Sequence, residues 1–411
     1  MASVWVGGLN NTGQHESLLV IENTTNKGIH VKSFSPIAVA LSGLLILAVA
    51  MGIGRFAFTP LLPMMEKDAG VSIALGGWLA AANYVGYLLG AVVAIRLRFW
   101  PVRIIVFSLA AIVIFTAIMG YTDQPVLWLL FRGLAGVASA WVLVFASAWK
   151  LQRLAAAQAS HLNGVVFGGV GAGIMLAGLL CMAFQGMDWS SAVSWRALGV
   201  AALLLSLLAL HALLEHAPAA IEVPKAGSYA SHGGSTIVVI SYGIFGFGYI
   251  IPATFLPAMA KHLVPDPAIF GWAWPVFGLA ALVSTLIAGR LFAHFSNRAV
   301  WGVCHLIMGA GTVLPVLVPD MAGILLAALC VGGTMMVVTY AGLQEARRLS
   351  PHAPAVLMAK ITVAFAIGQI LGPVCVSLAP AGAKSLDTLL AVAAALLILS
   401  GLYLLRIRRT N

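Results

Sequence analysis

Long apolar stretches separated by short polar breaks run from about residue 36 to residue 406. A transmembrane helix needs about 20 consecutive apolar residues, and these stretches reach that length. A transmembrane β-barrel would instead alternate apolar and polar residues. The pattern therefore predicts twelve transmembrane helices, at roughly 37–63, 72–95, 103–121, 126–149, 162–184, 194–214, 236–258, 268–290, 299–318, 321–343, 356–379 and 386–405.

Composition supports this prediction of an all-α membrane protein. Apolar residues make up 61% of the 411 residues and charged residues only 8%, against roughly 25% charged in soluble domains. So few charges could not solvate the surface of a water-soluble protein of this length. A soluble enzyme and a nucleic-acid-binding protein are therefore excluded, despite the formal net charge of +10.

The chain also matches itself without gaps at an offset of 194 residues. The matches include residue types that recur less readily by chance, namely Gly52 with Gly246, Gly54 with Gly248, Pro63 with Pro257, Gly77-Trp78 with Gly271-Trp272, and Arg96 with Arg290. Span one maps onto span seven, so the two six-helix halves share one topology, as in parallel-repeat transporters. The expected domains are a flexible cytoplasmic tail (1–35), a first half (36–214), a cytoplasmic linker (215–235), a second half (236–406) and a short cytoplasmic tail (407–411).

Basic residues give the expected orientation in the membrane. Of the 22 Lys and Arg residues, fifteen lie in tails and loops on the face shared with the termini, four on the opposite face and three within spans. Because Lys and Arg mark the cytoplasmic face, both termini are expected in the cytoplasm. The charges are spread over several short segments, so no nucleic-acid partner is expected.

The chemistry of an enzyme is not evident. The four cysteines lie singly in apolar runs, and no cluster of metal ligands, carboxylate pair or Ser/His/Asp set is recognisable. No metal, cofactor or catalytic residue is therefore expected. No Asp or Glu lies well inside a span, which argues against the usual carboxylate proton relay; Glu345, at the end of span ten, is the remaining candidate.

Two arginines within spans are the sharpest signal. Arg55 lies in span one and Arg132 in span four, and no carboxylate in any span can neutralise them. Insertion scales give at least about 2.5 kcal/mol for an arginine at the membrane centre. One interpretation is that both face a central cavity and bind an anionic group, for which the planar guanidinium is suited. The other is that Arg55 caps carbonyls freed by Pro60 and Pro63, while Arg132 extends outward.

Further polar and aromatic side chains are candidates for the same cavity. The repeat places Tyr249 at the position equivalent to Arg55, so an aromatic wall in the second half could oppose the arginines. Packing, an interfacial aromatic belt or helix–helix hydrogen bonds would explain these residues equally well. The candidates other than the arginines are Thr59, Asn83, Tyr84, Tyr249, Trp272, Tyr340 and Gln369, with Tyr242, Trp274 and Phe277 as further members of the wall.

Several motifs resemble those of the major facilitator superfamily of transporters. These are Arg132-Gly133-Leu134-Ala135-Gly136, the glycines from Gly168 to Gly173, Gly368-Gln369-Ile370-Leu371-Gly372-Pro373, and the loop Gly289-Arg290-Leu291-Phe292-Ala293-His294-Phe295. The loop departs from the superfamily pattern, because its acidic position holds Ala293, and Phe99 in the first half. The run from Gly52 to Met65 resembles the first helix of the YbfB/YjiJ-type family.

The resemblance implies an inner-membrane transporter that works by alternating access. It also implies roles in packing or gating for Gly52, Gly54, Pro60, Pro63, Arg96, Gly136, Gly171, Gly173, Arg290, Gly368, Gly372 and Pro373. With the arginines, it favours transport of a small, anionic or amphipathic organic solute by a monomer in the lipid bilayer. A proton-coupled drug or metabolite exporter and a membrane sensor that binds solute without moving it are the alternatives.

The topology can be tested by labelling single cysteines in intact cells. Cysteines introduced beside Asp123, Asp266 or Asp387 should react with an impermeant maleimide added outside, because these sites lie in the expected outer loops. Cysteines beside Lys225 or Arg347 should react only after the cells are lysed. Labelling of the 215–235 linker from outside would contradict the orientation.

Overall fold

The computed structural model describes residues 35–94, 96–97, 101–214, 235–264, 266–350, 354–380 and 383–406. The expected tails (1–35 and 407–411) and linker (215–235) lie almost wholly outside these residues. Within them, twelve helical segments are long and apolar enough to cross a membrane, and each coincides with one predicted span. The described residues form no strand, so the predicted all-α membrane fold is confirmed.

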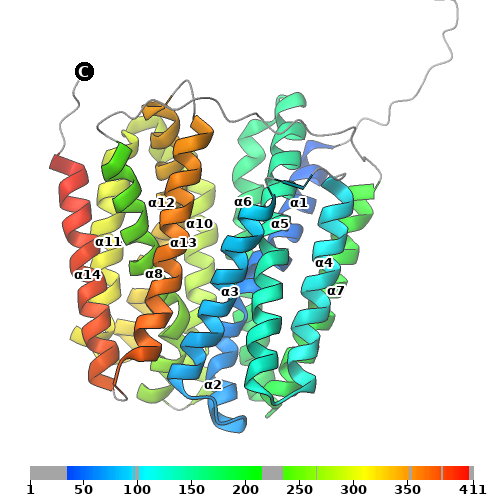
Figure 1. The fold of residues 1–411 in the computed structure, drawn as a ribbon, viewed down its shortest axis with the longest axis vertical. Coiled ribbons are helices and arrows are strands. Elements are labelled where there is room, and N and C mark those ends of the chain that lie inside the picture. Colours follow the sequence, from blue (N-terminus) through cyan, green and yellow to red (C-terminus); the bar gives the residue numbers. More distant parts are fainter. Residues whose placement is uncertain are drawn as a thin grey trace, which may run out of the picture. The chain divides into compact units, whose positions relative to one another are not determined.

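The helices fall into two sequential groups of six spans (Figure 1). The first group comprises α1 (Pro36–Leu47), η1 (Ala48–Phe56) and α2 (Phe58–Asp68) as span one, then α3 (Ile73–Ala94), α4 (Pro101–Ile118) with η2 (Met119–Tyr121), α5 (Pro125–Ala156), η3 (Ser160–Leu162) with α6 (Asn163–Gly186), and α7 (Ser191–Leu214). The second comprises α8 (Ser235–Leu263), α9 (Pro267–Phe270) with α10 (Ala273–His294), α11 (Asn297–Leu317), α12 (Met321–Leu349), α13 (Pro354–Leu378) and α14 (Ala383–Arg406).

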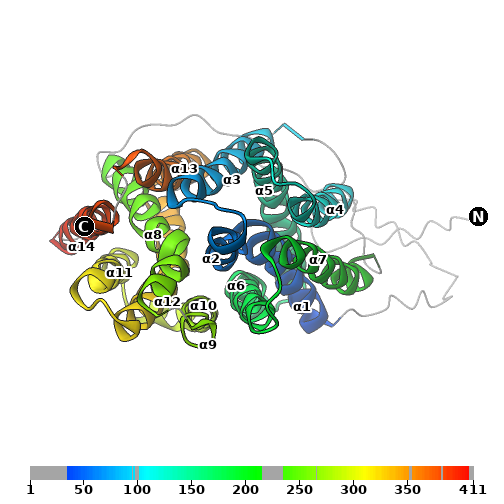
Figure 2. The same cartoon turned by 90° about the horizontal axis from the view of Figure 1, so that it is seen from below.

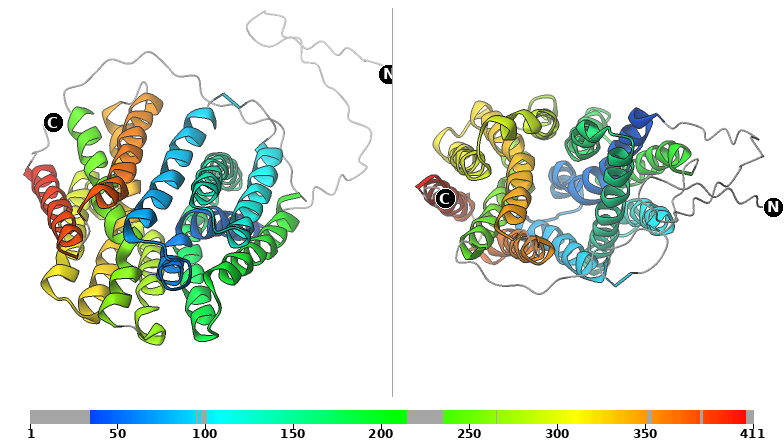
Figure 3. Two further views of the ribbon diagram at one scale, coloured as in Figure 1. Left: turned by 60° about the horizontal axis from the view of Figure 1, so that its bottom comes forward. Right: turned by 90° about the horizontal axis from the view of Figure 1, so that it is seen from above.

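Seen along the helix axes, α1–α7 gather on one side and α8–α14 on the other (Figures 2 and 3). Two helix pairs run beside each other across the boundary between these groups, α6 with α10 and α3 with α13. Smaller contacts join α2 to α8. The boundary between the halves is thus built from spans one, two and five of the first half and their counterparts in the second.

Span one is not a continuous α-helix. Its central part, η1, is a π-helix of nine residues that contains Gly52, Gly54 and Arg55. Pro60 and Pro63 follow in α2. Proline has no backbone N–H, so each of them leaves a carbonyl group of the preceding helical turn without its usual hydrogen-bond donor. π-Helical segments within α-helices are rare and frequently occur at functional sites. The carbonyl groups of Gly54 and Arg55, at the end of this stretch, accept hydrogen bonds from side chains of other spans.

Glycines allow the helices of the boundary and of each half to approach closely. A side chain on Gly52 would meet the backbone of Gly173, one on Gly171 the backbone of Leu282 in the other half, and one on Gly136 the carbonyl of Asn83. A side chain on Gly368 would likewise meet the carbonyl of Gly243, and one on Gly372 would meet the side chain of Ile250. Such small residues are the usual means of tight helix packing in a membrane.

Gly52→Ala should destabilise the protein, because the new methyl group would meet backbone atoms, including the Gly173 carbonyl oxygen at 2.7 Å. Overpacking of this kind costs about 1–3 kcal/mol, which would lower the melting temperature in detergent. Gly289→Ala is the matched control, since nothing lies within 4 Å of its added carbon. Equal melting temperatures for the two variants would show that this helix contact is loose.

Candidate functional site

Arg55 lies at the boundary between the two halves and is only 2% exposed. Its Nη2 donates a hydrogen bond of 2.5 Å to the amide oxygen Oε1 of Gln369. Arg55 belongs to span one and Gln369 to α13 of the second half. A charged side chain of one half is therefore bound to a neutral side chain of the other.

Gln369 also donates from its amide nitrogen to the hydroxyl of Tyr249 in α8. Arg55 and Tyr249 occupy equivalent positions in the two sequence repeats, so one glutamine joins the two. Three residues named separately as candidates from the sequence thus form one hydrogen-bonded chain, Arg55–Gln369–Tyr249, which we call the central triad. Tyr249 is in turn stacked against Phe245 and Phe365.

Aromatic rings enclose the guanidinium of Arg55. Its central carbon lies 4.1 Å from the ring centre of Tyr87, 5.1 Å from that of Tyr84 and 5.2 Å from that of Phe56. Ring faces attract cations, so these contacts offset part of the cost of burying the charge. The Nε of Arg55 is buried without a hydrogen-bond partner, which leaves one edge of the guanidinium with an unused donor.

Arg132 holds the irregular backbone of span one rather than extending outward. It is 3% exposed, and it donates from Nη2 to the carbonyl of Arg55 at 3.0 Å and from Nη1 to that of Gly54 at 3.4 Å. Asn83 donates to the carbonyl of Arg132 at 2.8 Å and to that of Gly54 at 3.4 Å. One interpretation of the sequence was that Arg55 caps backbone carbonyls of span one; in the structure, Arg132 does so. Asn83, which lies in span two, binds carbonyls of spans one and four and so links the three spans.

The remaining candidates divide into two groups. Thr59 and Tyr84 are buried and bind the other half, Thr59 to the Ala253 carbonyl at 3.0 Å and Tyr84 to the Thr254 hydroxyl at 3.4 Å. Trp272 and Tyr340 are 46% and 43% exposed, and neither contacts the central triad. Tyr340 instead packs on Phe292 and accepts a hydrogen bond from Gln344. The structure thus gathers the first group at the boundary and leaves the second outside it.

Polar contacts between the halves are concentrated from the middle to one end of the bundle. At the end that the charge pattern places outside, Lys261 Nζ donates to the Pro63 carbonyl at 2.7 Å and lies 3.4 Å from the Glu66 carboxylate. His262 lies 4.0 Å from that carboxylate, and Ser377 donates to the Ala74 carbonyl at 2.9 Å. The central contacts of Thr59 and Tyr84 with the second half continue this series toward the middle of the bundle.

The loop arginines of the two repeats lie far from this arrangement. Arg96 and Arg290 are both exposed, and within the described part of the chain neither takes part in an ion pair. This agrees with the loss of the acidic position from both loops. The acid–base latch that the superfamily resemblance would suggest is therefore not formed between described residues.

Lys150 is a buried cation that sequence reasoning missed. Counted from the sequence as a cytoplasmic loop residue, it lies inside α5, because that helix continues to Ala156. It is 1% exposed; its Nζ lies 4.3 Å from the ring centre of Trp149 and donates to the Ser42 hydroxyl at 2.5 Å. Apolar length alone gave no signal for it, because the helix continues seven residues beyond the predicted end of the span at residue 149.

Glu345 joins spans nine and ten at their predicted cytoplasmic ends. Its side chain is buried, and its carboxylate accepts hydrogen bonds from Arg298 at 2.6 Å and from Arg348 at 2.8 and 2.9 Å. Both acceptor oxygens are therefore occupied by arginines. The one acidic candidate for proton transfer serves in this structure as the centre of an ion-pair cluster remote from Arg55.

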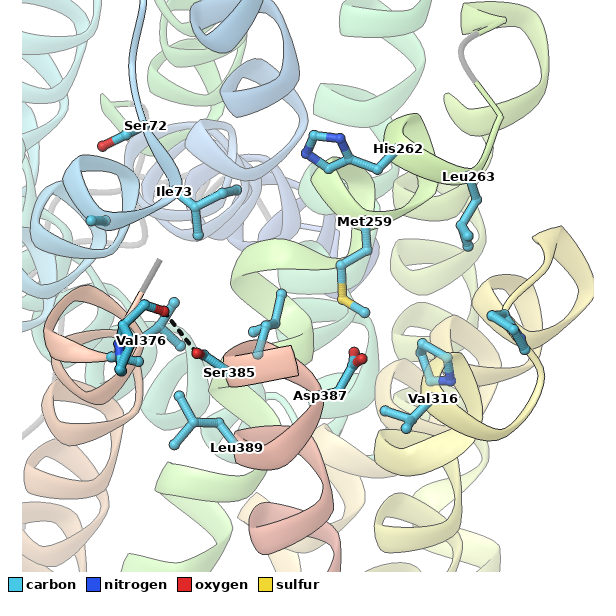
Figure 4. Close-up of a pocket in the computed structure, with 16 residues that line it drawn as sticks. Ser72, Ile73, Met259, His262, Leu263, Val316, Val376, Ser385, Asp387 and Leu389 are labelled. Carbon is cyan, nitrogen blue, oxygen red and sulfur yellow. Dashed lines mark hydrogen bonds between the residues drawn. The ribbon is translucent and has the colours of Figure 1, made fainter. Parts of the chain in front are cut away.

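A cavity of about 650 Å³ opens near the predicted outer end of the second half (Figure 4). Its walls are mostly apolar side chains, from α3 in the first half and from α8, α11, α13 and α14 in the second. Ser72, His262, Ser385 and Asp387 are among the polar lining residues. Ser385 donates to the Pro380 carbonyl at its edge. The cavity shares no residue with the central triad, but it adjoins the contact between His262 and Glu66.

The described residues provide no anion for the two central arginines. The ion pairs formed among these residues have Glu66, Asp188 and Glu345 as their acids, and none of them includes Arg55 or Arg132. No group of three potential metal ligands occurs among them either. The central site can therefore offer one guanidinium edge, an amide and a phenol to a ligand that accepts hydrogen bonds.

Twelve spans in two repeated halves, joined through a polar centre, define a membrane transport protein of the major facilitator type. The sequence profile of a family described as "Uncharacterised MFS-type transporter YbfB" matches residues 47–405. The chain belongs to this family.

Two individual proteins resemble the chain. A stretch of 94 residues, 22% of this chain, is 33% identical to the "Uncharacterized MFS-type transporter YceJ" of Bacillus subtilis (strain 168) and spans about a quarter (24%) of that relative's length. A crystal structure of a point mutant of the nucleoside transporter NupG matches 90% of this chain and 100% of its own, with a TM-score of 0.67 and 16% sequence identity. At that identity, the likeness concerns the fold.

Glu345→Gln should lower the melting temperature, because charge-assisted hydrogen bonds worth about 1.5–3 kcal/mol each are weakened. Solute uptake into proteoliposomes should nevertheless fall less than tenfold, since the cluster is remote from Arg55. Glu345→Asp, which retains the charge, is the control for stability. Complete loss of uptake by a stably folded Glu345→Gln protein would identify Glu345 as a coupling residue.

Proposed function

We propose that this protein is a secondary active transporter that moves a small organic anion across the inner membrane of a bacterium. The observation that carries the proposal is Arg55, a buried guanidinium at the boundary between the halves that has no acidic partner among the described residues. Its partner is a neutral amide. An anionic solute would supply the charge that the protein itself does not place there.

Physical chemistry favours an anion over a purely structural role for Arg55. Arg132 already binds the carbonyls of the irregular span, so Arg55 is not needed to cap them. Charged groups within membranes are costly and usually mark a substrate path. A guanidinium presents parallel N–H donors that match a carboxylate, and Arg55 retains one buried donor without a partner.

The distribution of contacts between the halves supports alternating access. Hydrogen bonds and ion pairs join the halves from the centre to the predicted outer end, through Thr59, Lys261 and Ser377. We infer that this arrangement is a state closed toward the outside. Rocking of the two halves, typical of parallel-repeat transporters, would break these contacts and form others at the cytoplasmic end.

The alternatives make different demands on the same site. A proton-coupled exporter with a conventional relay needs a carboxylate that can take up and release a proton in the transport path, whereas Glu345 is held by two arginines away from the centre. A transporter of neutral solutes, such as the nucleoside transporter whose fold is similar, would not need Arg55. A sensor would bind the solute without transport. Counterflow in proteoliposomes, with organic anions and neutral analogues and with and without a pH gradient, separates these possibilities.

Replacement of Arg55 tests the proposal directly. Arg55→Ala should weaken solute binding by about 1.5–3 kcal/mol, the range for hydrogen bonds to charged groups, and Arg55→Lys should weaken it less because it keeps the charge but loses the paired donors. The measurement is the rise in melting temperature caused by each organic anion, which depends on affinity, together with counterflow.

Arg406→Ala and Arg406→Lys are the matched controls, since Arg406 is exposed at the end of α14. Both control proteins should bind and transport as the unmodified protein does. If a folded Arg55→Ala protein were stabilised as strongly as the unmodified protein by every solute that stabilises the latter, Arg55 would be excluded from the binding site.

A further inference from the structure

The central triad contains a neutral group where a charged one would bind more strongly. We propose that the carboxamide of Gln369 occupies the place of the solute's carboxylate, and that the solute is an aromatic monocarboxylate which displaces it from Arg55. This inference rests on the proposed function, since it assumes that Arg55 is the anion-binding residue. Beyond the proposed function, it names the chemical class of the solute and explains how solute binding would weaken a contact between the two halves.

The first support is the similarity between a carboxamide and a carboxylate. Both groups are planar and present an oxygen acceptor, and Gln369 places its oxygen 2.5 Å from Arg55 Nη2. The amide has only that one acceptor, however, and Arg55 Nε stays buried without a partner. A carboxylate has two acceptor oxygens and can bind a guanidinium at two donors. Exchange of the amide for a carboxylate would therefore satisfy the orphaned donor.

The second support concerns the number of charges. Arg132 uses both terminal nitrogens on the carbonyls of Gly54 and Arg55, so only its Nε, which like that of Arg55 is buried without a partner, is left over. Lys150 is bound to Ser42, outside the central triad. Arg55 is thus the guanidinium with a terminal nitrogen that a solute could take over from a neutral side chain, and it matches one carboxylate. A second carboxylate would enter an aromatic environment without a basic partner among the described residues.

The third support is the character of the surrounding walls. Tyr84, Tyr87 and Phe56 lie around the guanidinium, with ring centres 4.1–5.2 Å from its central carbon. On the other side of Gln369, Tyr249 stacks with Phe245 and Phe365 at ring-centre distances of 5.0 and 5.7 Å. An aromatic ring attached to the carboxylate could pack on either set, because aromatic pairs attract beyond their buried area.

Displacement of Gln369 would couple binding to movement. The hydrogen bond between Arg55 and Gln369 joins span one to α13, and hence one half to the other. A carboxylate that takes the Arg55 donors removes this bond, and Gln369 then remains with Tyr249 in the second half. The solute therefore competes with a bond that holds the halves together, and its binding favours states in which they separate at this point.

The test uses benzoate as the probe and benzamide as its uncharged counterpart of nearly equal shape. Benzoate should raise the melting temperature of the purified protein in detergent, whereas benzamide should not, and the dianion phthalate should act more weakly than benzoate. Absence of any effect of benzoate, or an equal effect of benzamide, would overturn the assignment of an aromatic monocarboxylate.

Two variants of Gln369 test the competition. Gln369→Glu supplies a carboxylate within the protein, so it should raise the melting temperature without a solute and lower the apparent affinity for benzoate about tenfold or more. Gln369→Met removes the competing acceptor at similar volume, so benzoate should bind several-fold more tightly. An unchanged affinity for benzoate in a folded Gln369→Glu protein would overturn the competition.

Arg55→Ala, measured with the same probe, separates the two proposals. If Arg55→Ala loses the effect of benzoate while Gln369→Glu keeps it, Arg55 binds the anion but Gln369 does not compete, and the inference alone fails. If Arg55→Ala keeps the effect in full, the proposed function of Arg55 fails as well. Gln344→Glu, at a half-buried glutamine of α12 outside the central triad, controls for the added charge.

Discussion

Two positive charges buried among apolar helices are the constraint on which the centre of this protein depends. A guanidinium removed from water must recover its hydrogen bonds and part of its solvation from the protein. Here, neutral groups supply these interactions. Backbone carbonyls bind Arg132, and an amide and aromatic rings surround Arg55. The two carbonyls that Arg132 binds, those of Gly54 and Arg55, both lie in the π-helical part of span one.

The two halves share a fold but place different functional groups at equivalent positions. The position of Arg55 in the first repeat is taken by Tyr249 in the second, and Gln369 lies between them. Arginines at both positions, each beside the same glutamine, would repel each other, and tyrosines at both would leave no charge for a ligand. Divergence of the two repeats at this one position thus creates a site with a donor-rich side and an aromatic side.

The sequence was sufficient for the architecture, because twenty-residue apolar stretches admit few structures in a membrane. It also singled out Arg55, Tyr249 and Gln369, since polar groups within such stretches are rare. Their mutual contacts could not be predicted, because the rotation of each helix depends on packing against its neighbours. The unknown helix rotations also explain why Trp272 and Tyr340, which are exposed, were included among the candidates. Lys150 was left out for another reason: the length of an apolar stretch does not determine where the helix ends.

The hydrogen bond from Thr59 to the Ala253 carbonyl spans 194 residues, the offset that aligns the two repeats. Only points close to a two-fold axis can touch their own counterparts in a symmetric assembly. This pair therefore marks where the internal pseudo-symmetry axis passes through the molecule. At this axis the two repeats meet through equivalent positions that differ in chemistry, because a threonine in the first half supplies a hydroxyl donor where the second half has an alanine and offers only its backbone carbonyl.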